Sequence, residues 1–247
     1  MNLSAWHAID FHVHTPLSRC HEPETWDAAM FLGAAEAAGL DAVVVSDHHT
    51  SENAWMLADR ADQNRSVRVV PGMEVTTPQG HLLVLFDIDG PRETWRQFAA
   101  DVGLANAHHG NGSHSVAPSM SEVITIAAGH GAFSIPAHVD RWPNGFMERG
   151  LDYKARAAIH GHSEVSAIEI TLPNTKASWE EGRVPPFTRA MTCVRGSDAH
   201  GLAEVGRRPT WVRSRGLSLA DLRSAFVAGR CTSFDDPRRS EGCVPDE

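Results

Sequence analysis

The chain has 247 residues, of which 42% are hydrophobic and 21% are charged, and it carries 31 acidic against 22 basic side chains. This length and composition fit one medium-sized domain with a sizeable core, and the formal charge of −9 excludes a protein that holds nucleic acid by a general excess of positive charge. Two counts are unusual: the chain has 15 histidines, and Lys154 and Lys176 are its only lysines.

Short runs rich in β-branched residues alternate with segments of helical pattern along the whole chain. In chain order we expect a strand at 8–13, a helix at 25–38, a strand at 41–46, a helix at 51–64, strands at 67–71 and 81–86, helices at 92–102 and 119–130, a strand at 132–136, a helix at 152–160, strands at 165–170, 191–195 and 210–213, and a helix at 218–228. Alternation of strands and helices predicts a parallel sheet, and seven or eight such units predict its closure into a β/α barrel.

The chain shows no repeat and no linker, so we expect residues 1–234 to form one domain and the polar residues 235–247 to form a flexible tail. Residues 103–118 are rich in Gly and His, and a loop of this length is typically functional or flexible. The first residues do not resemble a signal peptide, and no apolar run approaches the roughly 18 residues that span a bilayer. The four cysteines lack CxxC spacing, which favours reduced thiols, so we expect a cytoplasmic protein with no membrane contact.

Five of the expected strands carry or run into side chains that can bind metals. The first strand places Asp10, His12 and His14 on one face, because successive side chains point to opposite faces of a strand. The other four strands run into Asp47 and His48, into Glu74, into His138, and into Asp198 and His200. The carboxyl ends of barrel strands meet at one mouth, so these side chains are expected to gather there. Nitrogen and carboxylate ligands suit Zn²⁺, Mn²⁺ or Fe²⁺, and a set larger than one ion needs predicts two or three metal ions.

The same residues resemble the successive motifs of the PHP (polymerase and histidinol phosphatase) family. The matching stretches are FHVHT at 11–15, SDH at 46–48, PGME at 71–74, PAH at 136–138 and GSDAH at 196–200. The resemblance runs in order from about residue 8 to residue 228 and is most similar to the PHP modules of ATPase-associated bacterial proteins, although no GxxxxGK[ST] loop is present. It implies a distorted seven-stranded, TIM-like β/α barrel with a trinuclear metal site and phosphoester hydrolysis.

The resemblance also implies a role for individual residues. The implied metal ligands are His12, His14, His48, Glu74, His81, His138, Asp198 and His200, with Glu74 bridging two ions. Asp10 and Asp47 are expected to orient their neighbours rather than to bind metal. This chain departs from the family pattern after His14-Thr15. There the family often has Ser-Asp-Gly, whose Asp is a metal ligand, whereas this chain reads Ser18-Arg19-Cys20-His21. Either His21 or Cys20 takes the ligand position of the missing Asp, or one metal position is weakened; we favour His21.

Arginine side chains are the candidates for substrate contacts, because a guanidinium can donate to two phosphate oxygens. We expect Arg19 and Arg141 to bind phosphate, with Arg207 or Arg208 as a third candidate and a solvated surface charge as the alternative for each. The histidines of the 103–118 loop either cover the mouth of the barrel or belong to a flexible segment; they are His108, His109 and His114.

The expected function is hydrolysis of a phosphomonoester or nucleotide by a metal-activated water, with Asp198, His138 and Glu74 as catalytic residues. A small phosphorylated molecule or nucleotide is the expected substrate, and long nucleic acid is less expected because of the negative charge. Two alternatives stay open. One is an amidohydrolase, although the scarcity of lysine disfavours the carboxylated lysine that its binuclear members commonly use. The other is a non-catalytic metal-binding PHP module, because the usual Asp after Ser18 is missing.

Overall fold

The computed structural model describes residues 4–61, 67–148, 150–229 and 231–238. In chain order these residues form β1 (Ala5–Val13), α1 (Ala28–Ala37), β2 (Ala42–Val45), α2 (Glu52–Ala61), β3 (Arg68–Thr77), β4 (Gly80–Leu85), α3 (Thr94–Asp101), α4 (Met120–Gly129), β5 (Phe133–Pro136), α5 (Tyr153–His160), β6 (Ala167–Glu169), α6 (Lys176–Glu180), β7 (Thr192–Val194), β8 (Thr210–Ser214), α7 (Leu219–Ala228) and β9 (Thr232–Ser233). Each expected strand and helix is present, and α6 and β9 are additional. Residues 62–64 of the helix expected at 51–64 lie outside the described residues.

Side-chain caps mark where several helices begin. Ser119 and Glu122 form a capping box before α4, in which the Glu122 carboxylate accepts a hydrogen bond from the Ser119 N–H at 2.8 Å. The Ser218 hydroxyl accepts a hydrogen bond from the Asp221 N–H at 3.1 Å at the start of α7. After α4 the chain turns at Gly131, whose φ of 72° is a left-handed conformation that glycine adopts without steric cost. Local sequence therefore explains these helix boundaries.

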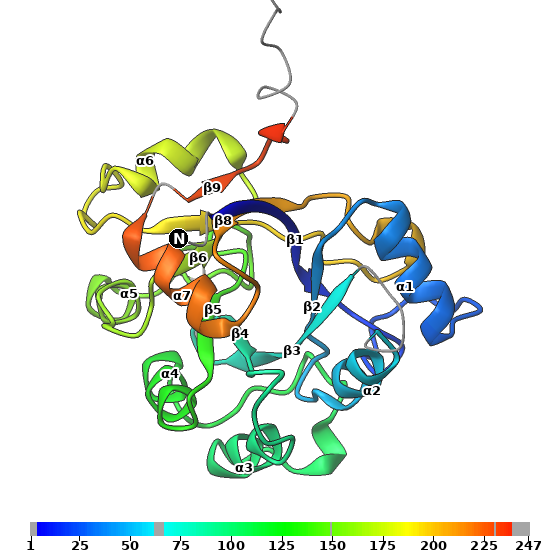
Figure 1. The fold of residues 1–247 in the computed structure, drawn as a ribbon. Helices are drawn as coiled ribbons and strands as arrows, with labels where there is room; N and C mark the ends of the chain where they lie inside the picture. Colours follow the sequence, from blue (N-terminus) through cyan, green and yellow to red (C-terminus); the bar gives the residue numbers. More distant parts are fainter. Residues whose placement is uncertain (1–3, 62–66, 149, 230, 239–247) are drawn as a thin grey trace, which may run out of the picture.

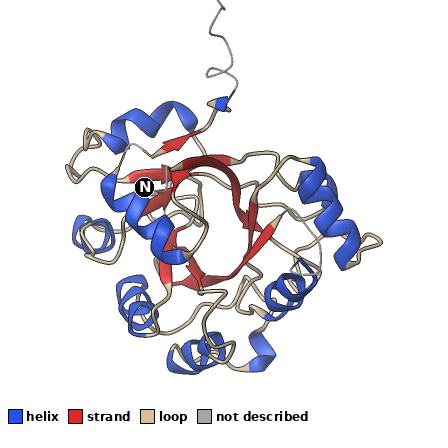
Figure 2. Cartoon of the chain, viewed as in Figure 1, coloured by secondary structure: helices blue, strands red, loops and turns tan. Residues whose placement is uncertain are grey.

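The strands curl into a ring with the helices on its outside (Figures 1 and 2). Hydrogen bonds divide the described strands into a seven-stranded sheet, in the order β5-β4-β3-β2-β1-β8-β9, and a two-stranded sheet, β6-β7. The pairs β1–β2, β2–β3 and β6–β7 are parallel, whereas β3–β4, β4–β5, β1–β8 and β8–β9 are antiparallel. The α/β class is confirmed, but the expectation of a parallel, closed barrel is wrong: the sheet is mixed and forms half a barrel.

The reversal of β4 follows from the short connection that precedes it. Only Pro78 and Gln79 lie between β3 and β4, and two residues can form a hairpin but not the crossover of about a dozen residues that a parallel neighbour needs. Gly80 fits the turn because its φ is 126° and an added Cβ would lie 2.2 Å from the Asn144 carbonyl oxygen. The reversal brings the start of β4, and with it His81, to the end of the ring where the parallel strands finish.

Single contacts, rather than a ladder of hydrogen bonds, join the two sheets. The Val139 N–H, just after β5, donates to the Glu169 carbonyl of β6 at 2.8 Å. On the other side, the Thr210 hydroxyl accepts from the Arg195 N–H at 2.8 Å. The β6-β7 pair thus fills the gap in the curled sheet, and the ends of β5, β6, β7 and β1 meet at one mouth.

The core has an inner and an outer part. One buried cluster combines residues of β1 to β8, such as Phe11, Val44 and Ile135, with α7 as its only helix among the described elements. The other two clusters pack the sheet against the remaining helices. The ring is therefore filled by side chains, as the interior of a closed β/α barrel is, and the polar cluster described below lies at its end.

The remaining expectations about the chain concern its tail and membrane contact. Residues 235–238 of the expected tail are described, and the Arg238 guanidinium lies 3.9 Å from the centre of the Trp211 ring. Residues 239–247 lie outside the described residues. Among the described helices, none has the length and apolar character needed to cross a membrane.

Candidate metal centre

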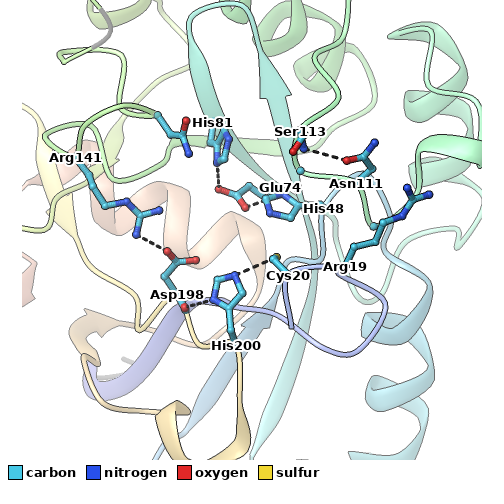
Figure 3. A pocket seen from close by; sticks show the side chains of 13 residues that line it. Arg19, Cys20, His48, Glu74, His81, Asn111, Ser113, Arg141, Asp198 and His200 are labelled. Atoms are coloured by element: carbon cyan, nitrogen blue, oxygen red, sulfur yellow. Dashed lines mark hydrogen bonds and ion pairs between the residues drawn. The ribbon is translucent and has the colours of Figure 1, made fainter. Parts of the chain in front are cut away.

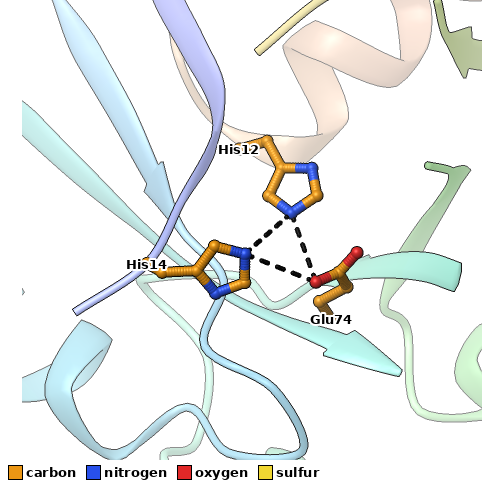
Figure 4. A group of neighbouring side chains, drawn as sticks. All are labelled: His12, His14 and Glu74. Carbon is orange, nitrogen blue, oxygen red and sulfur yellow. Dashed lines mark hydrogen bonds and ion pairs between the residues drawn. The ribbon is translucent and has the colours of Figure 1, made fainter. Parts of the chain in front are cut away.

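Side chains from the ends of several strands converge into one polar cluster. Three groups of residues each offer ligand atoms that lie within 4.8 Å of one another: His12, His14 and Glu74 (Figure 4); His14, Asp198 and His200; and His48, Glu74 and His81. Because His14 and Glu74 each belong to two groups, the three groups form one continuous cluster. These residues come from β1, β3, β4 and the segments that follow β1, β2 and β7.

Glu74 is at the centre of this cluster and is only 1% exposed. Its Oε2 lies 3.4 Å from Nε2 of both His12 and His14 and 3.0 Å from Nδ1 of His48. Its Oε1 lies 2.7 Å from Nδ1 of His81 and 3.2 Å from Nε2 of His138. The structure thus brings the implied bridging carboxylate into contact with five of the implied histidine ligands.

The outward nitrogens of the histidines are held by hydrogen bonds, which defines where their lone pairs point. His12 Nδ1 donates to the Glu169 carboxylate at 3.0 Å. His14 Nδ1 donates to the Ser18 hydroxyl at 2.9 Å, because that hydroxyl itself donates to Asp47 at 2.7 Å. When the rings are neutral, the Nε2 atoms of both therefore carry lone pairs that face the cluster, as in metal sites where a second group fixes the tautomer.

These lone pairs give a direct test of whether a metal fits. His12 Nε2 and His14 Nε2 are 3.2 Å apart, and two lone pairs at this distance repel unless a cation or a proton lies between them. His48 Nδ1 is buried without a hydrogen-bond partner beside Glu74, which is a costly arrangement for a polar atom that has no ligand. The donor set, nitrogen and carboxylate oxygen, is that of Zn²⁺, Mn²⁺ or Fe²⁺ sites. The cluster therefore fits divalent metal ions.

The charges in the cluster are strongly coupled. Burial opposes the charge on Glu74 and Asp198, but the surrounding histidines hold the pKa of both carboxyl groups well below their usual values. Burial likewise opposes protonation of His14, yet Asp198 and Glu74 raise its pKa to about 9. At His48 burial dominates and lowers the pKa to about 3. Without a metal, protons on His12 and His14 balance the buried carboxylates, and a divalent cation can take their place.

Asp10 and Asp47 lie outside the three ligand groups and bind backbone and hydroxyl groups instead. Asp47 accepts hydrogen bonds from the N–H and the hydroxyl of Thr15, at 2.7 and 2.6 Å, and from Ser18. Asp10 accepts from the N–H and the hydroxyl of Ser197, at 2.8 and 2.6 Å. The two carboxylates therefore hold the segments that follow β1 and β7, which carry the ligands.

Sequence reasoning missed Glu169, at the end of β6. This side chain is 2% exposed and accepts three hydrogen bonds, from His12 Nδ1 at 3.0 Å, from the His138 N–H at 2.9 Å and from the Gly196 N–H at 3.1 Å. A signal was present, because an acidic residue between Ile168 and Ile170 interrupts an otherwise apolar strand.

Three residues of the mouth have a backbone conformation that side chains with a Cβ rarely adopt. The φ angles are 57° at His49, 29° at His138 and 52° at Asp198, each just after a strand. Such conformations cost on the order of 1–3 kcal/mol and typically persist where the surrounding structure imposes them at a functional site. His49 is also tied to the 103–118 loop, because its Nε2 donates to the His114 carbonyl at 2.8 Å.

A pocket of about 400 Å³ opens above the cluster (Figure 3). Its walls carry both arginines that were expected to bind phosphate, Arg19 and Arg141. Arg141 pairs with Asp198, and Arg19 donates to the Ala107 carbonyl at 2.9 Å. Arg207 instead pairs with Glu204 and does not line this pocket.

The structure also separates the two candidates for the ligand position after Ser18. Cys20 lines the pocket, and its Sγ lies 3.1 Å from His200 Nε2. His21 lies outside the ligand groups, since its Nδ1 donates to the Glu22 carbonyl at 2.8 Å and it does not line the pocket. Partial desolvation, with the negative charge of Glu74, raises the pKa of the Cys20 thiol to about 11.

The 103–118 loop forms one wall of the pocket, but its histidines do not. Gly110, Asn111, Gly112 and Ser113 line the pocket. The rings of His108 and His114 stack on each other with centroids 3.5 Å apart, and the ring of His109 lies beside that of Trp95. Gly112 packs directly on a ligand candidate, because an added Cβ would lie 2.4 Å from His48 Nε2.

No protein-family model and no curated protein matches this sequence, so the comparison rests on solved structures. The lesion-specific endonuclease PfuEndoQ from Pyrococcus furiosus superposes with a TM-score of 0.70 at 16% identity, over 95% of this chain and 60% of that one. A two-domain protein from Bacteroides vulgatus, which contains a predicted PHP-like metal-dependent phosphoesterase, superposes with a TM-score of 0.63 at 17% identity, over 93% of this chain and 64% of that one. An amidohydrolase from Chromobacterium violaceum has a TM-score of 0.55 at 15% identity, over 78% of this chain and 87% of that one.

This chain thus spans less than two thirds of the first two proteins. At these identities the likeness establishes the fold alone, and the finer resemblance to ATPase-associated modules stays a prediction. The chain shares its fold with these proteins, one of which contains a predicted PHP-like metal-dependent phosphoesterase, the family that the sequence motifs of this chain resemble.

Proposed function

We propose that this protein is a metal-dependent phosphoesterase that hydrolyses a small phosphomonoester or a nucleotide in the pocket above the cluster. The observation that carries the proposal is the juxtaposition of a buried histidine–carboxylate cluster with two arginines on the wall of one pocket. The residues that would hold two or three ions are His12, His14, His48, Glu74, His81, His138, Asp198 and His200. Bound there, Mn²⁺, Zn²⁺ or Fe²⁺ would supply Lewis-acid activation of water and neutralise charge on the phosphoryl oxygens.

We assign substrate binding and proton transfer to different side chains of the pocket. Arg141, whose side chain is 38% exposed, can turn its guanidinium from Asp198 toward two phosphoryl oxygens. Asp198 faces both the cluster and the pocket, since Oδ1 lies 3.2 Å from His14 Nε2 and Oδ2 contacts Arg141. We assign to Asp198 the acceptance of a proton from the attacking water. Glu74 and His138 are both buried and contact each other inside the cluster, where we assign them to binding the metal ions.

The amidohydrolase alternative is supported by one structural neighbour and disfavoured by the lysines of this chain. Lys176 pairs with Glu180 at 2.6 Å, and Lys154 is an exposed residue of α5. Neither lysine lines the pocket, so neither is placed to serve as a carboxylated bridging ligand. We therefore propose phosphoester rather than amide hydrolysis.

The test compares substrates with one enzyme preparation. The protein is loaded with Mn²⁺, Zn²⁺ or Fe²⁺ and offered phosphomonoesters, nucleotides, a DNA oligonucleotide and cyclic amides, while elemental analysis counts the bound metal. We expect the wild type to release phosphate. We expect Asp198→Asn to lower the rate of phosphate release about 10²–10⁴-fold without a change in circular dichroism, and His14→Ala to abolish it. Amide turnover without phosphate release contradicts the proposal. Fewer than two metal equivalents per chain with no phosphate release identifies a non-catalytic metal-binding module instead.

A further inference from the structure

Cys20 is the one cysteine among the described residues that is exposed, and it faces the proposed metal centre. Its Sγ lies 3.1 Å from His200 Nε2 (Figure 3). His200 Nδ1 donates to the Asp198 carbonyl oxygen at 2.8 Å, so Nε2 carries the lone pair and is the nitrogen available to a metal. The sulfur therefore lies beside the free ligand atom of His200.

The backbone holds Cys20 in this position from both sides. The Arg19 N–H donates to the Gly110 carbonyl at 2.8 Å, and the Glu22 N–H donates to the His200 carbonyl at 2.8 Å. The segment between them is thus tied to the 103–118 loop and to the segment after β7, and it presents the sulfur to the pocket. His21 is the next residue of the same turn, and its Nδ1 donates a hydrogen bond to the Glu22 carbonyl.

Among the described residues, the neighbouring ligand group has three members. His14, Asp198 and His200 offer three ligand atoms within 4.8 Å of one another, whereas a tetrahedral zinc site takes four. Sulfur and nitrogen ligands of a tetrahedral zinc ion lie roughly 3.5 Å apart, given bonds of about 2.3 and 2.0 Å. The separation of 3.1 Å between Sγ and His200 Nε2 needs to open by only a few tenths of an ångström, and the turn that carries Cys20 must also bring Sγ toward His14 and Asp198, because Cys20 is not a member of their group.

We propose that Cys20 is a thiolate ligand of the metal ion held by His14, Asp198 and His200, and that it makes this position selective for Zn²⁺ over Mn²⁺ and Mg²⁺. Thiolates favour softer ions, whereas sites of oxygen ligands suit Mg²⁺ and Mn²⁺. When the metal–sulfur bond forms, the S–H proton leaves to solvent. The inference rests on the proposed metal centre and adds to it a ligand and a metal preference.

A different use of the pair, with Cys20 as a nucleophile activated by His200, has less support. A reactive thiolate needs positive charge beside it, whereas burial and the negative charges of Glu74, Asp198 and Asp47 raise the pKa of this thiol. In the metal-free protein these charges keep the thiol protonated, and a bound cation reverses the local field.

Cobalt substitution tests the ligand directly, because a thiolate bound to Co²⁺ has a near-ultraviolet charge-transfer band that nitrogen and oxygen ligands lack. We expect the band in the cobalt-loaded wild type and its loss in Cys20→Ser and Cys20→Asp, which retain the buried Cys193 and Cys231. His21→Ala is the matched control, and we expect it to keep the band. A cobalt-loaded wild type without the band, or a Cys20→Ser variant that retains it, overturns the proposal.

Two further measurements cover the case in which a variant does not fold. Iodoacetamide alkylation of Cys20 in the wild type, located by peptide mass spectrometry, is expected to slow about tenfold or more with Zn²⁺ but not with Mg²⁺; equal rates contradict the proposal. In a competition between Zn²⁺ and Mn²⁺, Cys20→Asp is expected to lower the bound zinc-to-manganese ratio about tenfold, and an unchanged ratio contradicts it. Failure of the wild type to bind any cobalt would instead refute the metal centre itself, so the two failures are distinguishable.

Discussion

Glu169→Gln is the substitution that best tests how the centre is held together. The change keeps the shape of the side chain but replaces a carboxylate, which accepts hydrogen bonds at both oxygens, by an amide with one accepting oxygen. In the structure Oε2 accepts from His12 Nδ1 and the His138 N–H, and Oε1 accepts from the Gly196 N–H. All three donors are directed at the carboxylate, so the amide nitrogen must face at least one of them.

The size of the effect follows from these contacts. The better orientation keeps the amide oxygen on His12 and His138 and leaves one buried donor, the Gly196 N–H, unpaired. An unpaired buried donor costs about 1–3 kcal/mol, and at this chain length each kcal/mol lowers the melting temperature by about 2–4 °C. We therefore expect the metal-free variant to melt about 2–12 °C lower. Loss of the carboxylate partner of a metal-binding histidine is expected to weaken metal binding about 10–100-fold.

Calorimetric melting of the metal-free protein measures the first effect, and competition with a chromophoric chelator measures the second. Glu93→Gln is the matched control, because Glu93 is exposed and pairs with Arg96 on the surface, an interaction worth little. A Glu169→Gln variant with the melting temperature and the metal affinity of the wild type would refute the reasoning. It would mean that Glu169 does not orient His12.

Three further predictions concern other parts of the site. Gly112→Ala places a Cβ 2.4 Å from His48 Nε2, so the ring must move, and we expect metal affinity in the chelator competition to fall about tenfold. Arg141→Ala removes a charged hydrogen-bond donor worth about 1.5–3 kcal/mol, and we expect kcat/KM for phosphate esters to fall about 10–150-fold. In the metal-free protein, the free energy of unfolding should fall as the pH rises from 6.5 to about 9, because the pKa of His14 is raised to about 9 in the folded state and its proton contributes stability only below that value. Urea unfolding at several pH values measures this decline, which bound metal should weaken by replacing the proton.

Each of these predictions has a control and a contrary result. Gly129→Ala should leave metal affinity unchanged, because among the described residues no atom outside its own stretch of helix lies within 4 Å of its added Cβ. A Gly112→Ala variant that behaves the same way contradicts the packing argument. Arg183→Ala, which removes only an exposed pair with Glu181, should leave kcat/KM unchanged. Equal kinetics for Arg141→Ala would remove that side chain from the pocket chemistry. Stability of the metal-free protein that rises between pH 6.5 and 9 would contradict the protonation of His14.

Much of the fold and of the site was accessible from the sequence. Alternating apolar runs located the strands, because the period of side chains along a strand depends only on nearby residues. The same runs ended in His, Asp or Glu, and strands of one barrel finish at a common mouth, so the positions of His14, His48 and Asp198 in one cluster followed from local order. Strand direction was harder: alternation alone suggested a parallel sheet, and the two-residue connection that requires the reversal of β4 became visible only because β3 continues to Thr77, beyond the strand expected at 67–71.

Only the tertiary structure decided which of two adjacent side chains faces the cluster and which distant groups hold it. Cys20 and His21 are equivalent in sequence spacing, yet hydrogen bonds to Gly110 and His200 turn the sulfur inward. Glu169 joins His12 across 157 positions of the chain, a contact that exists only because β6 closes the gap in the curled sheet. The local sequence pattern was enough to place His, Asp and Glu at the ends of strands. Their grouping into one charged, buried centre depended on strand pairing between remote segments, which the periodicity of the sequence does not encode.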